Sequence, residues 1–366
     1  MRQGPESGGW GPGGRGWGLG VGGWGLRFAA CAVVVVGCGC GRYADFSLPL
    51  LTGGDVRASY TFEPRPQPVL SPGAGWESND VLNPSVVASP TPNPQPLTPG
   101  FQLLYSAFDG RTWHTGLASS EDGFQWRKRG KVLSPDPHTW EGSYIAANGS
   151  ALVLGKEIWY WYVAGTEEKP LLGLARSSDG LAWRKEPAPV LQTGPYASWD
   201  EQGVADPYVI RIDPYFYLYY LGQDRARRQR LGVARSPDGI HWEKLRANPI
   251  LELGDPGAFD DAGLGEPAVW SARGFYWMLY TGLDPGINRK LGLARSTDGV
   301  VWEKRPPVFG GPAAWDSKVI CDPTVLPDGE NVRVWFGGGD VASRDSHLHG
   351  QIGVGVLRPS LTPTTH

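Results

Sequence analysis

The sequence predicts an all-β fold, a five-bladed β-propeller of four-stranded antiparallel blades. A string of the form Leu-Gly-x-Ala-Arg-Ser-x-Asp-Gly-x-x-Trp-x-Lys recurs at Leu172–Lys185, Leu231–Lys244 and Leu291–Lys304, with a looser copy at Thr115–Lys128. A marker of one aromatic residue followed by one acid recurs five times. Beyond the N-terminal segment, sustained helical periodicity is missing from the sequence. A period near 60 residues built from strands and turns is typical of radially arranged sheets.

Each repeat predicts four strands: an inner strand, an aromatic strand, the Leu-Gly-x-Ala-Arg-Ser strand and a strand that contains the closing tryptophan. Asp-Gly pairs between the third and fourth strands favour tight hairpins. Because these pairs recur with a serine partner, we interpret their aspartates as turn caps rather than as functional acids. The five markers are Trp76-Glu77, Trp140-Glu141, Trp199-Asp200, Phe259-Asp260 and Trp315-Asp316. A feature that recurs in every repeat indicates architecture more than chemistry.

The fifth repeat ends after its third strand, Gln351–Leu357. The segment Tyr60–Leu70, before the first repeat, resembles the ends of the other repeats. We therefore expect the N-terminal strand to complete the last blade, which would remove an exposed sheet edge. The expected propeller domain covers residues 55–360.

The charge balance excludes one class of partner. The chain has 34 basic and 37 acidic residues and a net charge of −3. A nucleic-acid-binding protein of this kind would need a basic face, so nucleic acid is not an expected partner.

The N-terminus predicts export. Residues 1–38 combine Arg27, an apolar run of ten residues over Phe28–Gly37, and Cys38. Such a run is too short to span a bilayer but suits the core of a signal peptide. The string Val35-Val36-Gly37-Cys38 resembles a bacterial lipobox, which implies lipidation of Cys38 and anchoring to the membrane of a bacterial cell envelope. A Sec-type signal with an incidental cysteine is the alternative.

Two further expectations concern this end of the chain. The first 20 or so residues, which are rich in Gly and Trp, are interpreted as a mis-set start. Residues 39–54 are expected to be a tether between the anchor and the propeller.

The position seven residues after each marker varies among the repeats, and this makes it informative. It is Asn83, Asp206, Glu266 or Asp322, and the second repeat has Ala147-Asn148 there. All of these positions lie at the mouths of inner strands and are expected to point toward the central axis. Converging carboxylates shift one another's pKa values apart, and such a pair is what glycoside hydrolysis requires. A solvated polar ring or a cation site is the alternative interpretation.

The repeats resemble the five-bladed propellers of glycoside hydrolase families 43, 32, 62 and 68, which include arabinanases, xylosidases, levansucrases and invertases. In that group an Asp in the first blade, an Asp in the second and a Glu in the third lie at inner-strand mouths. The Asp-Pro and Glu-Pro contexts at Asp206, Glu266 and Asp322 match in kind. Here, however, the acids belong to the third, fourth and fifth repeats.

The resemblance implies roles for the acids. Glu266 is the expected general acid, and Asp206 or Asp322 the base or nucleophile. Asn83, Asn148 and the arginines of the hairpin Asp224–Arg230, namely Arg225, Arg227 and Arg228, are expected to bind substrate. Because arginines favour carboxylate or phosphate groups on a ligand, an anionic sugar or polysaccharide is the expected substrate; a solvated charged hairpin without ligand contact is the alternative. The hairpin segments Asn288–Lys290 and Ser343–His349 are expected on the same face.

Three functions follow from these features. The leading expectation is an exported glycoside hydrolase that acts on a carbohydrate substrate through the central carboxylates. A non-catalytic propeller lipoprotein that binds glycan or protein is the first alternative, because the first two repeats lack the acids. Phosphorolysis or glycosyl transfer is the second. No cofactor and no catalytic metal are expected, and a structural cation in the central channel is left open.

Overall fold

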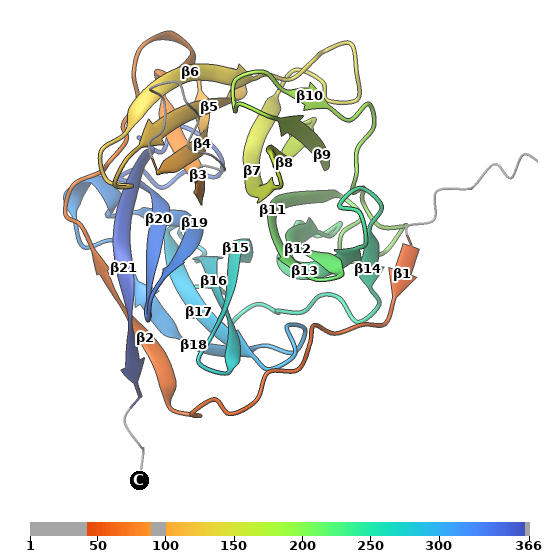
Figure 1. Cartoon of the computed structure of the whole chain (residues 1–366), viewed down its shortest axis with the longest axis vertical. Helices are drawn as coiled ribbons and strands as arrows, with labels where there is room; N and C mark the ends of the chain where they lie inside the picture. Colours follow the sequence, from red (N-terminus) through yellow and green to blue (C-terminus); the bar gives the residue numbers. More distant parts are fainter. Residues whose placement is uncertain (1–41, 89–99, 363–366) are drawn as a thin grey trace, which may run out of the picture. The chain divides into compact units, whose positions relative to one another are not determined.

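The computed structural model describes residues 42–88 and 100–362, which are built almost entirely of β-strands (Figure 1). The helical segments within these ranges are two short 3-10 turns, η1 (Gly75–Glu77) and η2 (Ala314–Asp316). The prediction of an all-β fold is confirmed. The expected export segment, residues 1–38 with Cys38, lies outside the described residues. In the described ranges, no helix has the length and apolar character that a membrane crossing requires.

Most strands pair antiparallel with the next strand in the chain, in groups of four. The groups are β3 (Asp80–Ala88), β4 (Phe101–Phe108), β5 (Trp113–Ser120) and β6 (Arg127–Leu133); β7 (Ile145–Leu154), β8 (Glu157–Gly165), β9 (Pro170–Ser177) and β10 (Arg184–Lys185); β11 (Gly203–Ile212), β12 (Tyr215–Gln223), β13 (Gln229–Ser236) and β14 (Glu243–Leu245); β15 (Gly263–Ala272), β16 (Phe275–Leu283), β17 (Arg289–Ser296) and β18 (Glu303–Phe309). A single parallel bridge between β5 and β7 joins the first two groups.

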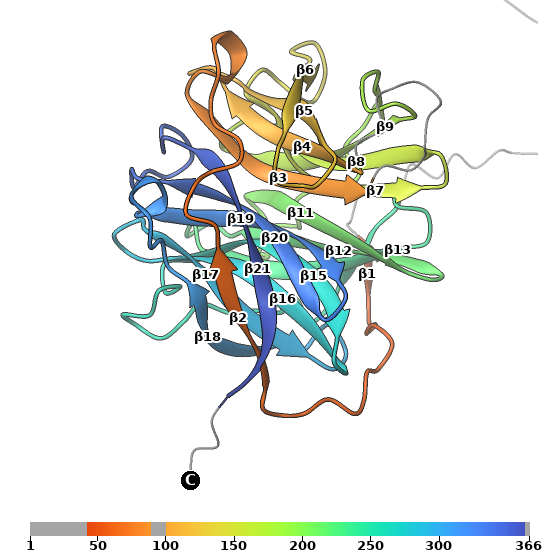
Figure 2. The same cartoon turned by 60° about the vertical axis from the view of Figure 1, so that its left-hand side comes forward.

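The last sheet combines both ends of the described chain. Its order is β19 (Val319–Asp328), β20 (Asn331–Gly339), β21 (Gln351–Leu361) and β2 (Ala58–Pro64). β2 pairs antiparallel with β21 over seven residue pairs. The first strands of the groups contact one another in the order β3, β7, β11, β15 and β19, and β19 also contacts β3. In Figure 1 these first strands surround the centre of the molecule, and Figure 2 shows β2 beside β21 in the last sheet.

Large aromatic side chains pack between neighbouring sheets. Trp161 and Trp335 are fully buried, and their indole N–H groups donate to the carbonyls of Gly239 and Gly123, both at 2.8 Å. Each acceptor is the glycine of an Asp-Gly turn in an adjacent sheet. The turns themselves are capped as expected: in one of them, the Asp238 carboxylate accepts two backbone N–H groups at 2.8 and 2.9 Å. The Asp-Gly turns are therefore structural and also lock one sheet to the next.

The acids of the aromatic–acid markers are buried in repeated ion-pair networks. Asp200 accepts the Tyr220 hydroxyl at 3.2 Å and the Lys244 ammonium at 2.5 Å. The corresponding acids Glu77, Glu141 and Asp260 each pair with one Tyr and one Lys of their own repeat. The fifth repeat differs, because Asp316 accepts a backbone N–H from Ala313 at 2.9 Å. Burial of these acids against partners of their own sheet agrees with an architectural role.

The segment expected to be a tether lies against the sheets from residue 42 onward. β1 (Arg42–Ala44) pairs parallel with β14. Leu48 is only 2% exposed, and its N–H donates to the carbonyl of Asp298 at 2.8 Å. The expectation of a free tether over residues 39–54 is therefore wrong for residues 42–54. The physical reason is that Phe46 and Leu48 bury apolar surface against the sheets, which a free tether would leave exposed.

Candidate functional site

Each first strand contains a bulge at the same place. The pairing with the second strand shifts across two residues in all five cases. The first of these two residues has a left-handed backbone, with φ between 48° and 52°: Asn83, Asn148, Asp206, Glu266 and Asp322. Bulges re-aim side chains, and left-handed non-glycine residues persist only where the surroundings hold them. The five bulges aim these side chains at one central place.

The second repeat corrects one detail of the sequence analysis. Ala147, seven residues after its marker, is the residue before the bulge, and Asn148 is the equivalent of Asp206. The loop between Trp140 and β7 is one residue longer than the corresponding loops, so counting from the marker fell one residue short. In strand order the central positions therefore read Asn83, Asn148, Asp206, Glu266 and Asp322.

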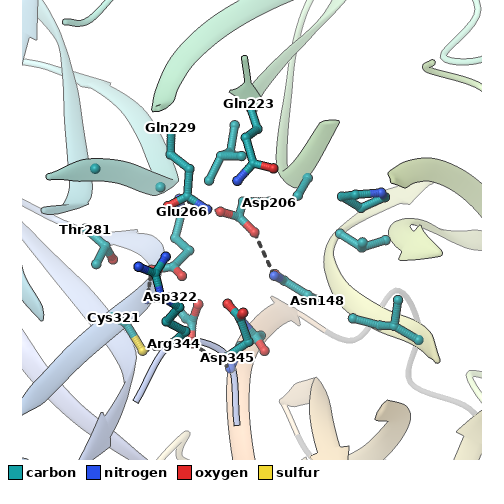
Figure 3. A pocket seen from close by; sticks show the side chains of 18 of the residues that line it. Asn148, Asp206, Gln223, Gln229, Glu266, Thr281, Cys321, Asp322, Arg344 and Asp345 are labelled. Atoms are coloured by element: carbon teal, nitrogen blue, oxygen red, sulfur yellow. Dashed lines mark hydrogen bonds between the residues drawn. The ribbon is translucent and has the colours of Figure 1, made fainter. Parts of the chain in front are cut away.

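Hydrogen bonds connect these five bulge residues, which together we call the bulge ring. The Glu266 N–H donates to Asp206 Oδ2 at 3.2 Å, and the Asp322 N–H donates to Glu266 Oε2 at 3.2 Å. The Asn83 N–H donates to Asp322 Oδ2 at 3.3 Å. The Asn148 amide donates to Asp206 Oδ1 at 2.7 Å, the dashed line of Figure 3. Each of the three carboxyl groups is thus oriented by a neighbouring repeat.

The bulge ring forms the floor of a cavity of about 520 Å³ (Figure 3). All five ring residues line the cavity, and so does Arg227. The structure thus brings together Asn83, Asn148, Asp206, Glu266 and Asp322 with one of the three predicted arginines.

Arg225 and Arg228 do not line the cavity, contrary to expectation. Arg225 stacks over the Tyr196 ring at 4.1 Å and pairs with Glu201 at 3.2 Å. Arg228 pairs with Asp224 at 2.8 Å within the same hairpin. Neighbouring acids pair with both guanidinium groups, and both arginine side chains are more than half exposed, 56% for Arg225 and 59% for Arg228.

Several cavity residues were not predicted individually. They are Trp113, Tyr144, Gln223, Gln229, Thr281, Arg289, Cys321, Arg344 and Asp345. Arg289, Arg344 and Asp345 belong to the two hairpin segments that the sequence analysis placed on the correct face. Gln223 directly precedes the predicted arginine hairpin Asp224–Arg230, and Gln229 lies within it. Thr281 and Cys321 carried no distinguishing sequence signal, because each lies within an apolar strand.

Burial and mutual repulsion raise the pKa values of two ring carboxyls. Burial, and then the charge of Glu266, raises the pKa of Asp206 to about 7. The same two causes, in the same order, raise the pKa of Asp322 well above its ordinary value. A hydrogen bond with Glu266 also raises the pKa of Asp322. Asp206 and Asp322 therefore retain their protons at pH values where an ordinary aspartate has released its proton.

Two residues beside Glu266 and Asp322, Cys321 and Arg289, also have shifted pKa values. Burial raises the pKa of the Cys321 thiol well above its ordinary value, and the charges of Asp322 and Glu266 raise it further. The thiol stays protonated and donates to Asp322 Oδ2 at 3.0 Å. For Arg289, burial disfavours the charged form, but the carboxylates beside it, Glu266 and Asp322 among them, raise the pKa above its usual range. A permanent guanidinium charge thus lies beside the acids.

One group of side chains in the described ranges brings three potential metal-ligand atoms within 4.8 Å of one another: Glu266, Cys321 and Asp322. The adjacent Arg289 charge opposes a cation there. A second hollow of about 30 Å³ lies among the ring residues and the prolines that follow them. A structural cation in this channel remains a prediction.

Comparison with known proteins agrees with this architecture. The family model "Glycosyl hydrolases family 32 N-terminal domain" matches residues 101–249. The uncharacterized protein MT1551 of Mycobacterium tuberculosis is 30% identical over 233 residues, which are 58% of this chain and 75% of that protein.

Solved structures share the fold at low sequence identity. A glycosyl hydrolase from Bacteroides ovatus has a TM-score of 0.64 and 18% identity over 86% of this chain and 99% of its own. A member of the GH130 family of mannoside phosphorylases, described as containing glycoside hydrolases that target beta-1,2 mannosidic linkages in Candida mannan, has a TM-score of 0.63 and 17% identity over 87% and 99%. The chain therefore belongs to one family with the mycobacterial protein MT1551, and its fold is similar to that of solved glycoside hydrolases.

Proposed function

We propose that this protein is a glycan-active enzyme that hydrolyses glycosidic bonds at the bulge ring. One observation carries the proposal: Asp206, Glu266 and Asp322 line one cavity, and burial together with the charge of Glu266 raises the pKa values of Asp206 and Asp322. Glycoside hydrolysis needs one carboxylic acid and one carboxylate on either side of the scissile bond. A set of acids whose pKa values are pushed apart can supply both.

Roles follow from burial and hydrogen bonding. Glu266 is the least buried of the three acids, and its Oε2 accepts the Asp322 N–H at 3.2 Å. In this proposal Glu266 donates a proton to the leaving glycosidic oxygen as the carbon–oxygen bond breaks. Asp206, held by Asn148, either takes a proton from the attacking water as base or attacks the anomeric carbon as nucleophile. Water supplies the new hydroxyl group; its other proton goes to Asp206 in the first case and to Glu266 in the second, when water cleaves the covalent intermediate.

The corrected second repeat brings this ring closer to the family that the sequence resembles. Three consecutive first strands present Asn148, Asp206 and Glu266, where the resembled families present Asp, Asp and Glu. Asn148 has no carboxylate to act as base or nucleophile. Asp322, from the next strand, supplies the third acid in this proposal.

The test is a reducing-end and chromogenic glycoside screen with wild type, Glu266→Gln, Asp206→Asn and Asp322→Asn. Glu330→Gln, an exposed acid on the β19–β20 turn, is the matched control. We expect the control to keep full turnover and Glu266→Gln to lose at least about 100-fold, the usual contribution of a general acid. Equal turnover in Glu266→Gln and wild type would refute the assignment.

A binding module is the second candidate, and Asn83 and Asn148 are the observation that favours it. Two of five ring positions carry amides, which bind hydroxyl groups but transfer no protons. In this case wild type would bind oligosaccharides without turnover. Phosphorolysis would instead appear as turnover that depends on inorganic phosphate, so the screen is run with and without it.

The fold proposal is a five-bladed propeller over residues 55–360, closed by the N-terminal strand. The pairing of β2 with β21, and the contacts of first strands from β3 through β19 and back to β3, support it. Export and lipidation at Cys38 stay a proposal from the sequence alone. Intact-mass measurement of membrane-fraction protein tests it, and a mass without acyl groups would refute it.

A further inference from the structure

Three buried polar atoms at the cavity have no hydrogen-bond partner within the described part of the chain: Thr281 Oγ1, Arg289 Nη1 and Asp322 Oδ1. Thr281 is 3% exposed and Asp322 is 6% exposed. Buried polar groups in folded proteins nearly always have a partner, because an unpaired one destabilises the fold. Three such atoms at one cavity indicate that a ligand supplies the partners.

The three side chains surround the proposed acid. Thr281 on β16 lies opposite Gly265, the residue before Glu266. Arg289 begins β17, the next strand of that sheet, and its charge interacts with Glu266 and Asp322. Asp322 on β19 bonds Glu266 through its backbone N–H. Figure 3 shows Thr281, Glu266 and Asp322 around the same hollow.

The charge of the cavity decides the class of ligand. Six acids line it, Glu167, Glu168, Asp206, Glu266, Asp322 and Asp345, against three arginines, Arg227, Arg289 and Arg344. Even with protons bound by Asp206 and Asp322, the arginines do not exceed the remaining carboxylates. An anionic ligand would meet repulsion, so the arginine count alone is misleading. An uncharged ligand with several hydroxyl groups meets no such repulsion.

We propose that Thr281, Arg289 and Asp322 form a subsite that binds adjacent hydroxyl groups of an uncharged sugar ring next to Glu266. Each sugar hydroxyl both donates and accepts, so neighbouring hydroxyls can pair with a guanidinium donor, a threonine hydroxyl and a carboxyl oxygen at once. The inference rests on the proposed function and names the substrate class of that site.

Thr281→Val tests the subsite because valine keeps the shape and removes the hydroxyl. Without ligand, we expect the unfolding midpoint of Thr281→Val to equal or exceed that of wild type, since an unpaired buried hydroxyl is lost. With sugar, we expect roughly tenfold weaker binding, the effect of losing one good hydrogen bond. Thr281→Ser, which keeps the hydroxyl, is the matched control and should bind like wild type.

Binding is measured by titration calorimetry against D-xylose, L-arabinose, D-mannose, D-galactose and D-fructose, and against D-glucuronate, D-galacturonate and inorganic phosphate. We expect at least one uncharged sugar to bind wild type and to be weakened by valine but not by serine. The inference is overturned if none of the uncharged sugars binds, if an anion binds more tightly, or if Thr281→Val lowers the midpoint and leaves affinity unchanged. If the subsite behaves as expected and no glycoside is cleaved, the proposed hydrolase function fails and the subsite stands.

Discussion

Ionisation of Asp206 should make the folded protein less stable as the pH rises. Burial, followed by the charge of Glu266, raises the pKa of this carboxyl from 3.8 to about 7. Between these two values the folded state holds a proton that the unfolded state has released. Stability therefore falls with increasing pH across this window and is fully reduced above pH 7. At about 1.4 kcal/mol per pKa unit, the full effect is on the order of 4 kcal/mol.

Asp206→Asn removes this effect because an amide does not ionise. The charged or polar groups that act on Asp206 are Glu266 and Asp345, which oppose its ionisation, and Asn148, whose amide favours it. We expect wild type and variant to unfold at similar free energies near pH 4. By pH 8 the variant should be more stable by up to about 4 kcal/mol, or roughly 8 °C in midpoint.

Urea unfolding at half-unit steps from pH 4 to pH 8.5 measures the difference without any substrate. Glu330→Gln, at an exposed turn, should run parallel to wild type throughout. A stability difference between Asp206→Asn and wild type that stays constant with pH would refute the reasoning, and so would a variant that is less stable at pH 8.

Three further predictions concern two buried contacts of the fold and the orientation of Asp206. Asp200→Ala leaves the buried Lys244 ammonium without its carboxylate partner, and urea unfolding should show a loss of about 3–5 kcal/mol. Leu48→Ala removes a buried side chain that packs over Gly299, and the same measurement should show a loss of about 2–5 kcal/mol; an unchanged stability would mean that the N-terminal segment is not anchored there. Gly265→Ala would place a Cβ 2.9 Å from Asp206 Oδ2 and so displace this carboxyl group. The turnover of a glycoside that wild type cleaves should fall at least tenfold, about 1.4 kcal/mol of transition-state stabilisation. Full turnover would show that the orientation of Asp206 is not critical.

The sequence predicted the strands well because their spacing is repeated. Every aromatic strand expected from the repeats lies within an observed strand, and the Asp-Gly turns have the predicted caps. Counting seven residues from each marker gave the wrong position in the second repeat. That repeat has one extra residue before Asn148, which is the equivalent of Asp206. The N-terminal segment was misjudged because it has no counterpart in the repeats, so its buried Leu48 carried no repeated signal.

The sequence predicted the acids at the centre of the cavity but not the other residues that line it. The ring acids recur at one place in the repeat, so their convergence followed from the fold class. Thr281 and Arg289 could not be found this way, because whether a strand residue faces a cavity depends on bulges and hairpin lengths beyond the repeat. Arginine number was also a poor guide, since Arg225 and Arg228 are paired with neighbouring acids.

The bulges affect how strongly each residue of the bulge ring indicates a function beyond architecture. A left-handed backbone at these positions favours Asn and Asp over other residues with a side chain, since their short polar groups bond locally. Asn83, Asn148, Asp206 and Asp322 are therefore residue types that architecture alone would accept. Glu266 is not, because a glutamate at φ 52° has no such local compensation. The proposed role of Glu266 as proton donor would explain why a glutamate occupies this left-handed position, with Asp322 and Arg289 beside its carboxylate.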